Sequence, residues 1–263
     1  MKMEIIDSFE VLKKIDGKFD MYVKVIVRQG GEYYIGKWRD RKHLPDDFSQ
    51  LEDVRIIPTK DRGPAMNPQW TTAQSEGDFY VKKPSLQDHV DPELENRVEH
   101  EIKMCELIKR DPHPNLASYY GCVVKEGKVM GICFKKYQRT LLETVNPGRL
   151  SKRHFMESGR PLVRNHMKGW LESLRSAVIH LHSLGLVHND ITPANIMLDE
   201  ADSPVLIDFG GLCRVGESLR TVKRTYGWYD EAVTEATKQA DLDALAEIEA
   251  LLFATPDGLK FSG

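Results

Sequence analysis

Two short stretches of this chain carry oxygen-bearing side chains at a spacing that suits phosphate chemistry. Asp190 and Asn195 stand five residues apart in the run His-Asn-Asp-Ile-Thr-Pro-Ala-Asn, and Asp208 opens an Asp-Phe-Gly triplet thirteen residues after Asn195. Hard oxygen ligands of this kind suit Mg²⁺, which keeps several waters and binds through one or two carboxylates together with substrate phosphates. The spacing therefore predicts a phosphotransferase.

Asp190 is the candidate for handling the proton. We expect it on an exposed loop between a long helix and a buried hairpin, where a carboxylate can orient an attacking hydroxyl and accept its proton. Taken singly, each Asp or Asn in this region is more often a turn-capping residue, because both types favour turns. The complete pattern favours a functional role over turn capping, because chance would have to place every one of its residues at this spacing.

The phosphates also need a cation, and Lys82 at the end of an apolar strand is the candidate. We expect Lys83 to face the other way, because successive strand residues point to opposite faces. Glu101 on the following helix can hold the ammonium in place, and it is preferred over Glu99 and Glu106 because it adjoins the apolar face of that helix. The alternative is a solvated strand-end lysine beside a surface glutamate.

The elements that must position these groups follow from apolar patterning and turn residues. Strands are predicted in a hairpin over 21–38 that turns at a Gly-Gly pair, and at 79–82, 116–124, 128–134, 196–198 and 205–207. Helices are predicted over 92–110, 163–184 and 241–252, and residues 39–77 read as a long polar surface loop. Strands come mostly first and helices mostly later, which predicts an α+β protein with segregated lobes.

Composition and charge narrow the class of protein. Hydrophobic residues make up 41% and the net charge is −3, which is ordinary for a soluble globular chain and leaves no nucleic-acid footprint. The sequence offers no membrane span and no signal peptide. The four cysteines form no CxxC pair, so we expect a reducing, cytoplasmic or otherwise intracellular setting. The basic run at 152–154 reads as solvated surface.

With these residues in view, the chain resembles the eukaryotic-type protein kinases. The resemblance covers about residues 78–252 and is strongest over 188–210. It implies a bilobal protein-kinase-like fold with a β-rich N-lobe and a truncated helical C-lobe. In that division, residues 1–77 add a hairpin and a long loop to the N-lobe, 78–137 form its remainder, and 138–263 form the shortened C-lobe. Several short runs look most like short kinase-like proteins of filamentous fungi.

The resemblance also implies roles for the candidate residues. Asp190 looks like the catalytic base, and Asn195 and Asp208 look like the two ligands of Mg²⁺. Lys82 with Glu101 looks like the ion pair that clamps the phosphates of ATP. ATP and Mg²⁺ are therefore the expected cofactors.

Further residues take supporting roles by the same resemblance. Lys136 and Tyr137 belong to the connector expected to contact adenine through backbone groups. Asp241 is expected to anchor the catalytic loop from below. A hydrophobic spine behind the site would contain four side chains, namely His188, Phe209, Cys105 and Tyr119.

The chain also departs from the family pattern. No G-x-G-x-x-G loop precedes Lys82, so we expect weaker ATP binding. Asn189 stands where Arg is usual, which predicts activity that is constitutive or partner-controlled instead of switched by phosphorylation at Thr221 or Thr225. Thr192 replaces a Lys near the γ-phosphate, so the rate is expected to be low. Few residues follow the 241–252 helix, so we expect the later C-lobe helices, which form much of the platform for protein substrates, to be missing.

Three hypotheses for the function stay open at this stage. The leading one is an ATP- and Mg²⁺-dependent kinase that phosphorylates Ser or Thr hydroxyls of a protein, with a regulatory protein as a further partner and with neither nucleic acid nor membrane involved. A small-molecule kinase is favoured by Thr192 and by the missing platform. A nucleotide-binding pseudoenzyme or scaffold is favoured by the missing glycine loop.

Overall fold

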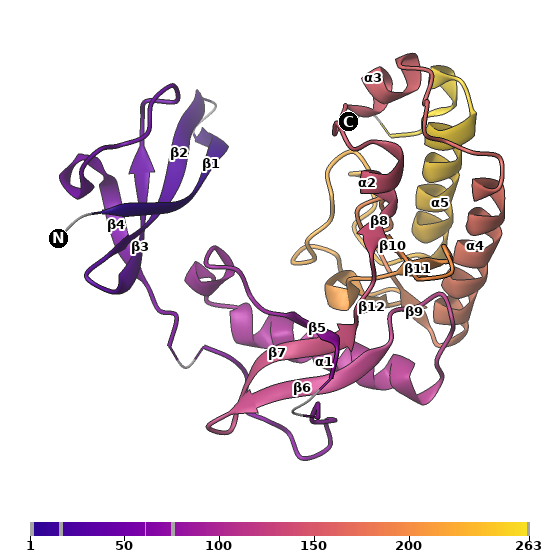
Figure 1. Ribbon diagram of the computed structural model, residues 1–263, viewed down its shortest axis with the longest axis horizontal. Helices are drawn as coiled ribbons and strands as arrows, with labels where there is room; N and C mark the ends of the chain where they lie inside the picture. Colours follow the sequence, from indigo (N-terminus) through magenta and orange to yellow (C-terminus); the bar gives the residue numbers. More distant parts are fainter. Residues whose placement is uncertain (1–2, 16–17, 61, 75–76, 262–263) are drawn as a thin grey trace. The chain divides into compact units, whose positions relative to one another are not determined.

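A computed structural model of the chain describes residues 3–15, 18–60, 62–74 and 77–261 (Figure 1). The chain divides into two units. Unit 1 comprises Met1–Ala65 and Lys83–Glu95, and unit 2 comprises Met66–Lys82 and Asn96–Gly263. The division at 77 and 137 expected from the sequence stays a prediction.

Unit 1 contains an antiparallel sheet whose strands follow the order of the chain. The strands are β1 (Glu4–Ile15), β2 (Lys18–Gln29), β3 (Glu32–Trp38) and β4 (Glu52–Ile57). The predicted hairpin is β2–β3, and Gly30 and Gly31 adopt φ of 63° and 86° at its turn, which glycine does without strain. Strand β4 lies in the stretch interpreted as loop, because its charged residues hide the apolar alternation.

Residue alternation gives this sheet two different faces. Val23, Val25 and Val27 of β2 form a buried cluster with Leu51 on one face. Ile26, which points the other way, forms a second cluster, the other buried members of which are Ile35 and Ile57.

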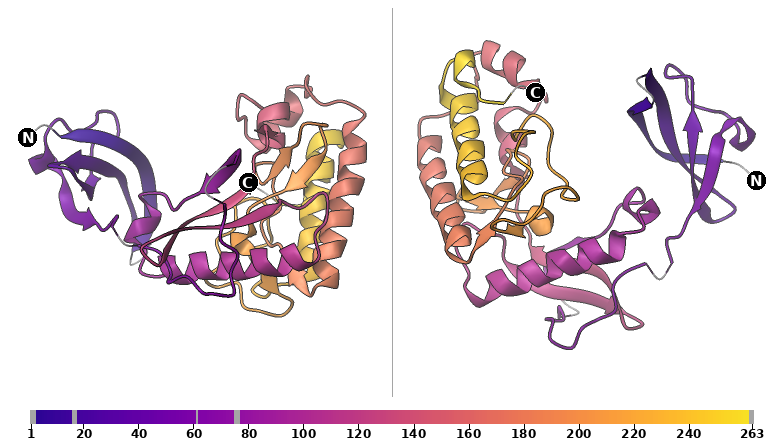
Figure 2. Two further views of the ribbon diagram at one scale, coloured as in Figure 1. Left: turned by 60° about the horizontal axis from the view of Figure 1, so that its bottom comes forward. Right: turned by 180° about the vertical axis from the view of Figure 1, so that it is seen from behind.

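Unit 2 begins with a three-stranded sheet in the order β5-β7-β6, and helix α1 packs against it (Figures 1 and 2). These elements are β5 (Phe79–Lys82), α1 (Leu94–Arg110, with its residues from Asn96 in unit 2), β6 (Tyr119–Lys125) and β7 (Lys128–Lys135). The sequence predicted all four. Ile102, Cys105 and Ile108 form the buried stripe of α1, at the helical spacing seen in the sequence.

The remainder of unit 2 is mainly helical, and α4 (Met167–Ser183) and α5 (Lys238–Phe253) lie side by side in both figures. Small sheets of order β11-β10-β8 and β12-β9 pack beside them. Their strands are β8 (Arg139–Thr140), β9 (Leu186–Val187), β10 (Ile196–Leu198), β11 (Pro204–Leu206) and β12 (Cys213–Arg214). The α+β prediction is therefore confirmed.

The sequence did not predict the shortest helices, because one or two turns cannot show helical periodicity. These are α2 (Leu141–Val145), α3 (Lys152–Glu157) and the 3₁₀ turns η1 (Phe48–Gln50), η2 (Asp88–Val90), η3 (Phe209–Gly211) and η4 (Pro256–Gly258). None of the helices in the described ranges is both long and apolar enough to cross a bilayer.

The backbone around Thr71 covers the outer edge of β6. Cys122 N–H donates to the Thr71 carbonyl at 2.8 Å, and Ala73 N–H donates to the Cys122 carbonyl at 2.9 Å. The two backbones come close enough to require glycine at Gly121, where φ is 130° and an added Cβ would lie 2.6 Å from the Ala73 nitrogen.

We predict that Gly121→Ala destabilises the protein by about 1–3 kcal/mol, because the methyl group meets backbone in a conformation that alanine disfavours. Chemical denaturation measures this change. The control is Gly148→Ala, at an exposed site with nothing within 4 Å of the added Cβ. Equal stability of the two variants would contradict the close approach seen at Gly121.

Candidate active site

Three charged side chains from separate elements of unit 2 meet at one point. Lys82 Nζ at the end of β5 donates to Glu101 Oε1 of α1 and to Asp208 Oδ1, each at 2.7 Å. Glu101 is buried, whereas Lys82 and Asp208 keep partial exposure. The structure thus brings together the cation and two of the acidic residues that the sequence singled out.

The local chain explains why these groups converge. Strand β5 pairs Lys82 with Ile132 of the central strand β7, which fixes the position of the lysine. Glu101 adjoins the fully buried Ile102 on α1. Asp208 adopts the left-handed conformation with φ of 65°, and its carboxylate accepts the Gly210 N–H at 3.2 Å in the turn after β11.

The charges of the three groups support one another. Burial disfavours the ammonium of Lys82, but the carboxylates of Glu101 and Asp208 outweigh burial and raise its pKa. Burial likewise disfavours the charged form of Asp208, yet Lys82 outweighs it and holds the pKa of that carboxyl below its usual value. Burial raises the pKa of Glu101, and Lys82 limits the rise.

Asp190 and Asn195 form the second half of the site. The Asn195 side-chain amide donates to the Asp190 carbonyl at 2.9 Å and to Asp190 Oδ2 at 2.8 Å. The other carboxylate oxygen of Asp190 accepts the backbone N–H of Thr225 at 2.8 Å. No hydrogen bond to the amide oxygen of Asn195 is found within the part of the chain that the structure describes, so this oxygen stays available to a cation. The sequence did not indicate Thr225, because a backbone N–H can donate from almost any residue type.

A buried carboxylate anchors the loop that carries Asp190. Asp241, in the first turn of α5, accepts the backbone N–H of His188 at 2.8 Å and that of Asn189 at 2.9 Å. His182 Nε2 lies 2.9 Å from the same carboxylate. These contacts join the loop to both α4 and α5, and they agree with the anchoring predicted for Asp241.

The predicted hydrophobic spine contains one more ring than expected. Its four predicted members, His188, Phe209, Cys105 and Tyr119, are all buried. Phe134 of β7 lies between two of them, with its ring centroid 6.2 Å from Phe209 and 6.0 Å from Tyr119, and Phe209 lies 6.4 Å from His188. Phe134 was missed because the sequence interpreted it only as a strand residue.

The connector residues Lys136 and Tyr137 have other partners than the cluster of Lys82, Glu101 and Asp208. Lys136 is exposed, with its ammonium 3.6 Å from Asp78, and the Tyr137 hydroxyl accepts the Ser118 N–H at 3.1 Å. Within the described ranges, neither residue forms a backbone hydrogen bond outside the strands. Their predicted contact with adenine stays a prediction, and it would use these backbone groups.

Asn189 and Thr192, two residues at which the chain departs from the family pattern, form contacts within the protein. Asn189 adopts φ of 66°, and its side-chain amide donates to the carbonyls of Val187 at 3.0 Å and Gly211 at 2.9 Å. Thr192 is buried, and its hydroxyl lies 3.3 Å from the Asn195 nitrogen. Neither residue supplies the cation that Arg or Lys would bring.

The interpretation of 152–154 as solvated surface is wrong for Lys152. Its ammonium donates to the buried Glu247 at 2.5 Å and to the Gly227 carbonyl, and it lies 4.2 Å from the centre of the Trp228 ring. The side chains of Lys152 and Glu247 are 10% and 0% exposed. This buried pair therefore holds the segment that follows Thr225, which supports the donor to Asp190.

Comparison with known proteins identifies the family. The model of the protein kinase domain matches residues 70–244, which is more than half of the chain, so the chain belongs to the protein kinase family. The predicted kinase-like fold is confirmed with it.

Three similar proteins illustrate the relationship. A probable serine/threonine-protein kinase of fowlpox virus is 28% identical over 55% of this chain and 51% of its own length. The DNA damage-responsive serine/threonine-protein kinase RqkA of Deinococcus radiodurans is 37% identical over 28% of this chain and 12% of its own length. Mouse mitogen-activated protein kinase kinase kinase 3 is 28% identical over 49% of this chain and 20% of its own length. The chain thus spans half the length of the first relative and a fifth or less of the other two.

The donor set of the site fits magnesium. Asp208 and Asn195 offer hard oxygen atoms, and nitrogen or sulfur ligands that would favour zinc are not among the candidate ligands. The described residues hold no group of three or more His, Cys, Asp or Glu side chains able to bind a metal alone. A magnesium ion here would therefore complete its shell with water and with nucleotide oxygens.

We predict that Lys82→Met makes stability depend on pH through Glu101. Without the ammonium, the buried carboxyl binds its proton more tightly in the folded state than its ordinary pKa of 4.5 allows. Stability is then greatest below that value and falls as pH rises, so the free energy of unfolding drops by about 1–3 kcal/mol between about pH 5 and about pH 8.

Denaturant titration at both pH values measures this drop. Adding Glu101→Gln to the variant should remove most of it, and Lys83→Met, at the exposed neighbouring lysine, should behave as wild type. A flat profile for Lys82→Met would contradict the coupling of Lys82 to a buried carboxylate.

We predict that Thr221→Glu and Thr225→Glu do not raise the rate of phosphate transfer, because the amide of Asn189 is occupied by two carbonyls and offers no phosphate-binding charge. Initial rates with labelled ATP measure the effect. A sharp rise in either variant would show that loop phosphorylation does switch the protein.

Proposed function

We propose that this protein is an ATP- and Mg²⁺-dependent kinase that transfers phosphate to serine or threonine hydroxyls of a protein. The observation that carries the proposal is the meeting of Lys82 with Glu101 and Asp208, each at 2.7 Å. Membership of the protein kinase family and the names of the three relatives support the reaction class.

Lys82 has the chemistry to bind phosphate oxygens of ATP. Its raised pKa keeps the ammonium charged at neutral pH, and Glu101 holds it at the end of β5. A fixed positive charge in a partly buried site stabilises the charge of the transferring phosphoryl group without reorganisation. Glu101 thus acts as a positioning residue.

Asn195 and Asp208 are proposed to hold the magnesium. When bound, the ion neutralises charge on the phosphate oxygens of the nucleotide. The lowered pKa of Asp208 keeps its carboxylate ionised for this role, and the amide of Asn195 turns its nitrogen toward Asp190, which leaves its oxygen for the cation.

Asp190 is proposed to act on the substrate hydroxyl. The hydroxyl oxygen attacks the terminal phosphorus of ATP, its proton passes to the Asp190 carboxylate, and ADP leaves. The Thr225 N–H and the Asn195 amide hold one oxygen each of this carboxylate, so its direction is fixed by the loop that Asp241 anchors. Lys136 and Tyr137 are proposed to meet the adenine through their backbones.

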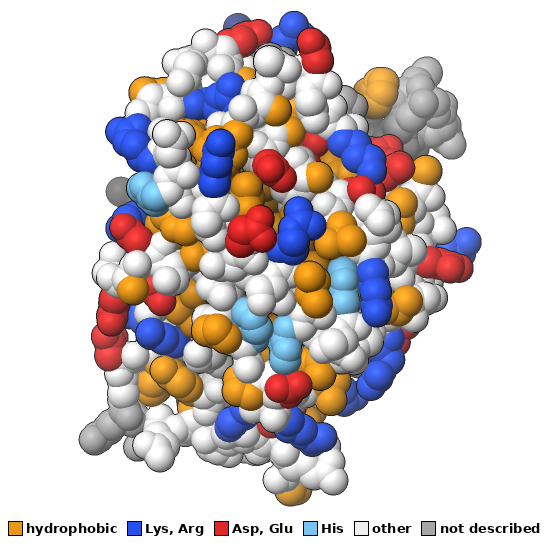
Figure 3. Space-filling model, turned by 90° about the vertical axis from the view of Figure 1, so that its right-hand side faces the viewer, with side chains coloured by type: hydrophobic (Ala, Val, Ile, Leu, Met, Phe, Trp, Pro, Cys, Tyr) orange, Lys and Arg blue, Asp and Glu red, His pale blue; other side chains and the backbone are white. Residues whose placement is uncertain are grey.

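Partner and setting follow from the same proposal. The substrate is a protein with a Ser or Thr hydroxyl, a regulatory protein is the further partner, and the reaction takes place in the cytoplasm or in another compartment inside the cell. The four free cysteines support a reducing setting. The face shown in Figure 3 interleaves basic and acidic side chains, without the one-sign stripe used to bind nucleic acid. We do not propose a membrane role, and the likeness to short fungal kinase-like proteins stays a prediction.

Two other functions each have one observation in their favour. The family match begins at residue 70 and takes in only the sheet of β5, β6 and β7 ahead of the helical part, which favours a binding-only scaffold that lacks a phosphate lid. The buried Thr192 stands where protein kinases place a cationic Lys, which favours a small-molecule kinase.

We predict that Asp190→Asn lowers phosphate transfer from labelled ATP to a generic protein substrate by about 10²–10⁴-fold, because the hydroxyl loses its proton acceptor. Thermal shift should show that Mg²⁺·ATP binding persists. The matched control is Glu200→Gln, an exposed acidic residue near the site in sequence, which should keep the wild-type rate.

The same assay separates the alternatives. Wild-type protein that binds Mg²⁺·ATP without any turnover would establish the scaffold instead. ADP release that needs a metabolite and no protein would establish the small-molecule kinase.

A further inference from the structure

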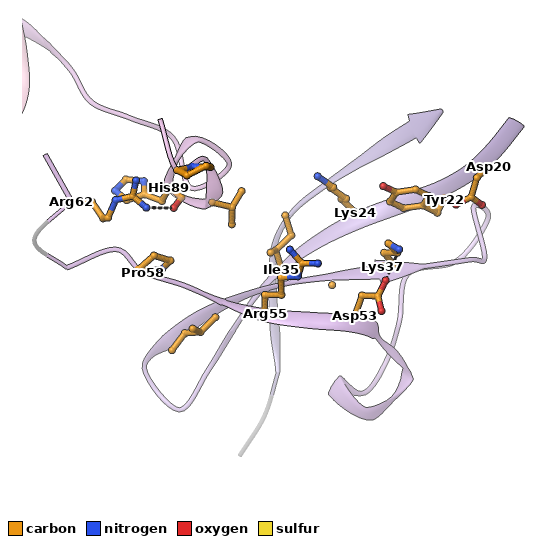
Figure 4. A pocket seen from close by; sticks show the side chains of 14 residues that line it. Asp20, Tyr22, Lys24, Ile35, Lys37, Asp53, Arg55, Pro58, Arg62 and His89 are labelled. Carbon is orange, nitrogen blue, oxygen red and sulfur yellow. Dashed lines mark hydrogen bonds and ion pairs between the residues drawn. The ribbon is translucent and has the colours of Figure 1, made fainter. Parts of the chain in front are cut away.

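Unit 1 contains a cavity of about 530 Å³, and most of its lining residues precede the region matched by the kinase domain model (Figure 4). Its floor is one face of the sheet, where Tyr22 and Lys24 of β2 alternate inward and Ile35 and Lys37 of β3 lie opposite strand β4. Arg55 of β4 pairs directly with Ile35. The volume falls in the range of sites that bind ligands or short peptide segments.

The cavity carries an excess of positive charge. Four lining side chains are cationic (Lys24, Lys37, Arg55 and Arg62) and two are carboxylates (Asp20 and Asp53). Lys37 pairs with Asp53, and Asp20 pairs with Arg39 from outside the lining at 2.6 Å. Arg62 is fixed by Glu95 and by the carbonyls of His89 and Asp91. Lys24 is also engaged, with its ammonium 5.9 Å from the centre of the Phe9 ring, so the charge of Arg55 is the one that the proposal uses.

Arg55 is the most available of these cations. Its side chain is exposed, and within the described ranges it forms neither a hydrogen bond nor an ion pair. Figure 4 shows its guanidinium at the middle of the cavity, in the region flanked by Lys24 and Lys37. A guanidinium in this position presents a fork of donors that matches a carboxylate.

The rim of the cavity is apolar and lies at a sheet edge. Ile56 and Val90, both lining residues, are 55% and 37% exposed. Strand β4 is the last strand in the sheet order, so one side of its backbone is not paired within this sheet. An extended peptide can add to such an edge by backbone hydrogen bonds, with alternate side chains reaching pockets.

We propose that this cavity is a docking site for an acidic, extended protein segment that adds to the edge of β4, places a carboxylate on Arg55 and, on the other face of the strand, places an aliphatic side chain against Ile56. Charge complementarity selects the acid, and the edge of β4 together with the exposed apolar rim selects a peptide. A nucleic acid fits less well, because its row of phosphates needs several available cations and would also meet Asp20 and Asp53, whereas a single carboxylate needs only Arg55.

The docking role rests on the proposed protein kinase function, whereas binding of the segment does not. A substrate held on unit 1 is tethered to the kinase region of the same chain, which raises its effective concentration without any new catalytic contact. The site thereby offers a way to select protein substrates that is independent of the active-site groups.

Binding is tested by fluorescence anisotropy on the full chain without ATP, with a labelled peptide of alternating Glu and Val as the probe. We expect Arg55→Glu to weaken binding by at least about tenfold and Ile56→Ala to weaken it by about threefold. The matched control is Lys42→Glu, at an exposed lysine of the same unit that does not line the cavity, and it should bind as wild type. Circular dichroism confirms that each variant is folded.

Several results would overturn the assignment. These are equal binding by Arg55→Glu and wild type, equal binding of a peptide with Gln in place of Glu, or tighter binding of single-stranded oligo(dT) or of a phosphorylated peptide. Adding the Glu-Val segment to a generic substrate should lower KM with kcat unchanged, in wild type and not in Arg55→Glu. Peptide binding with no phosphate transfer would defeat the proposed function alone, and transfer with an unchanged KM would defeat the docking role alone.

Discussion

The ammonium of Lys82 is stable in its partly buried position because two carboxylates meet it. A buried charge without such partners would be strongly destabilising, so β5, α1 and the turn after β11 must hold their side chains in register for the fold to tolerate it. The same constraint fixes the chemistry: Lys82 and Asp208, 126 residues apart in the chain, are held at 2.7 Å. Stability and the proposed phosphate binding thus depend on the same contact.

Buried residues fix the positions of the other functional groups. Asp241 fixes two backbone amides of the loop that carries Asp190, and the rings from Tyr119 to His188 pack behind Asp208. Lys152 and Glu247 hold the segment after Thr225 from a third direction. Unit 1 has its own clusters and its own charged cavity. The chain therefore combines a rigid chemical site with a separate surface suited to a partner.

Residue type and spacing were sufficient to find the groups that meet at the site. Asp190, Asn195 and Asp208 lie close in sequence, and alternation along β5 singled out Lys82. Groups whose role depends on distant partners could not be found in this way. Lys152 looks like part of a solvated basic run, and its burial depends on Glu247, 95 residues later, and on Trp228. Strand β4 was not predicted because its charged residues obscure the apolar alternation. One of those residues, Arg55, lines the cavity of unit 1.

Isothermal titration calorimetry of ATP with and without Mg²⁺ tests the central claim most directly. If Lys82 and Asp208 form a magnesium-nucleotide site, wild-type protein binds ATP more tightly with Mg²⁺ than without it. Asp208→Asn should lose that gain and keep its metal-free affinity, whereas Asp202→Asn, at an exposed surface pair with Arg139, should behave as wild type. An ATP affinity that is indifferent to Mg²⁺, or an unchanged gain in Asp208→Asn, would contradict the account.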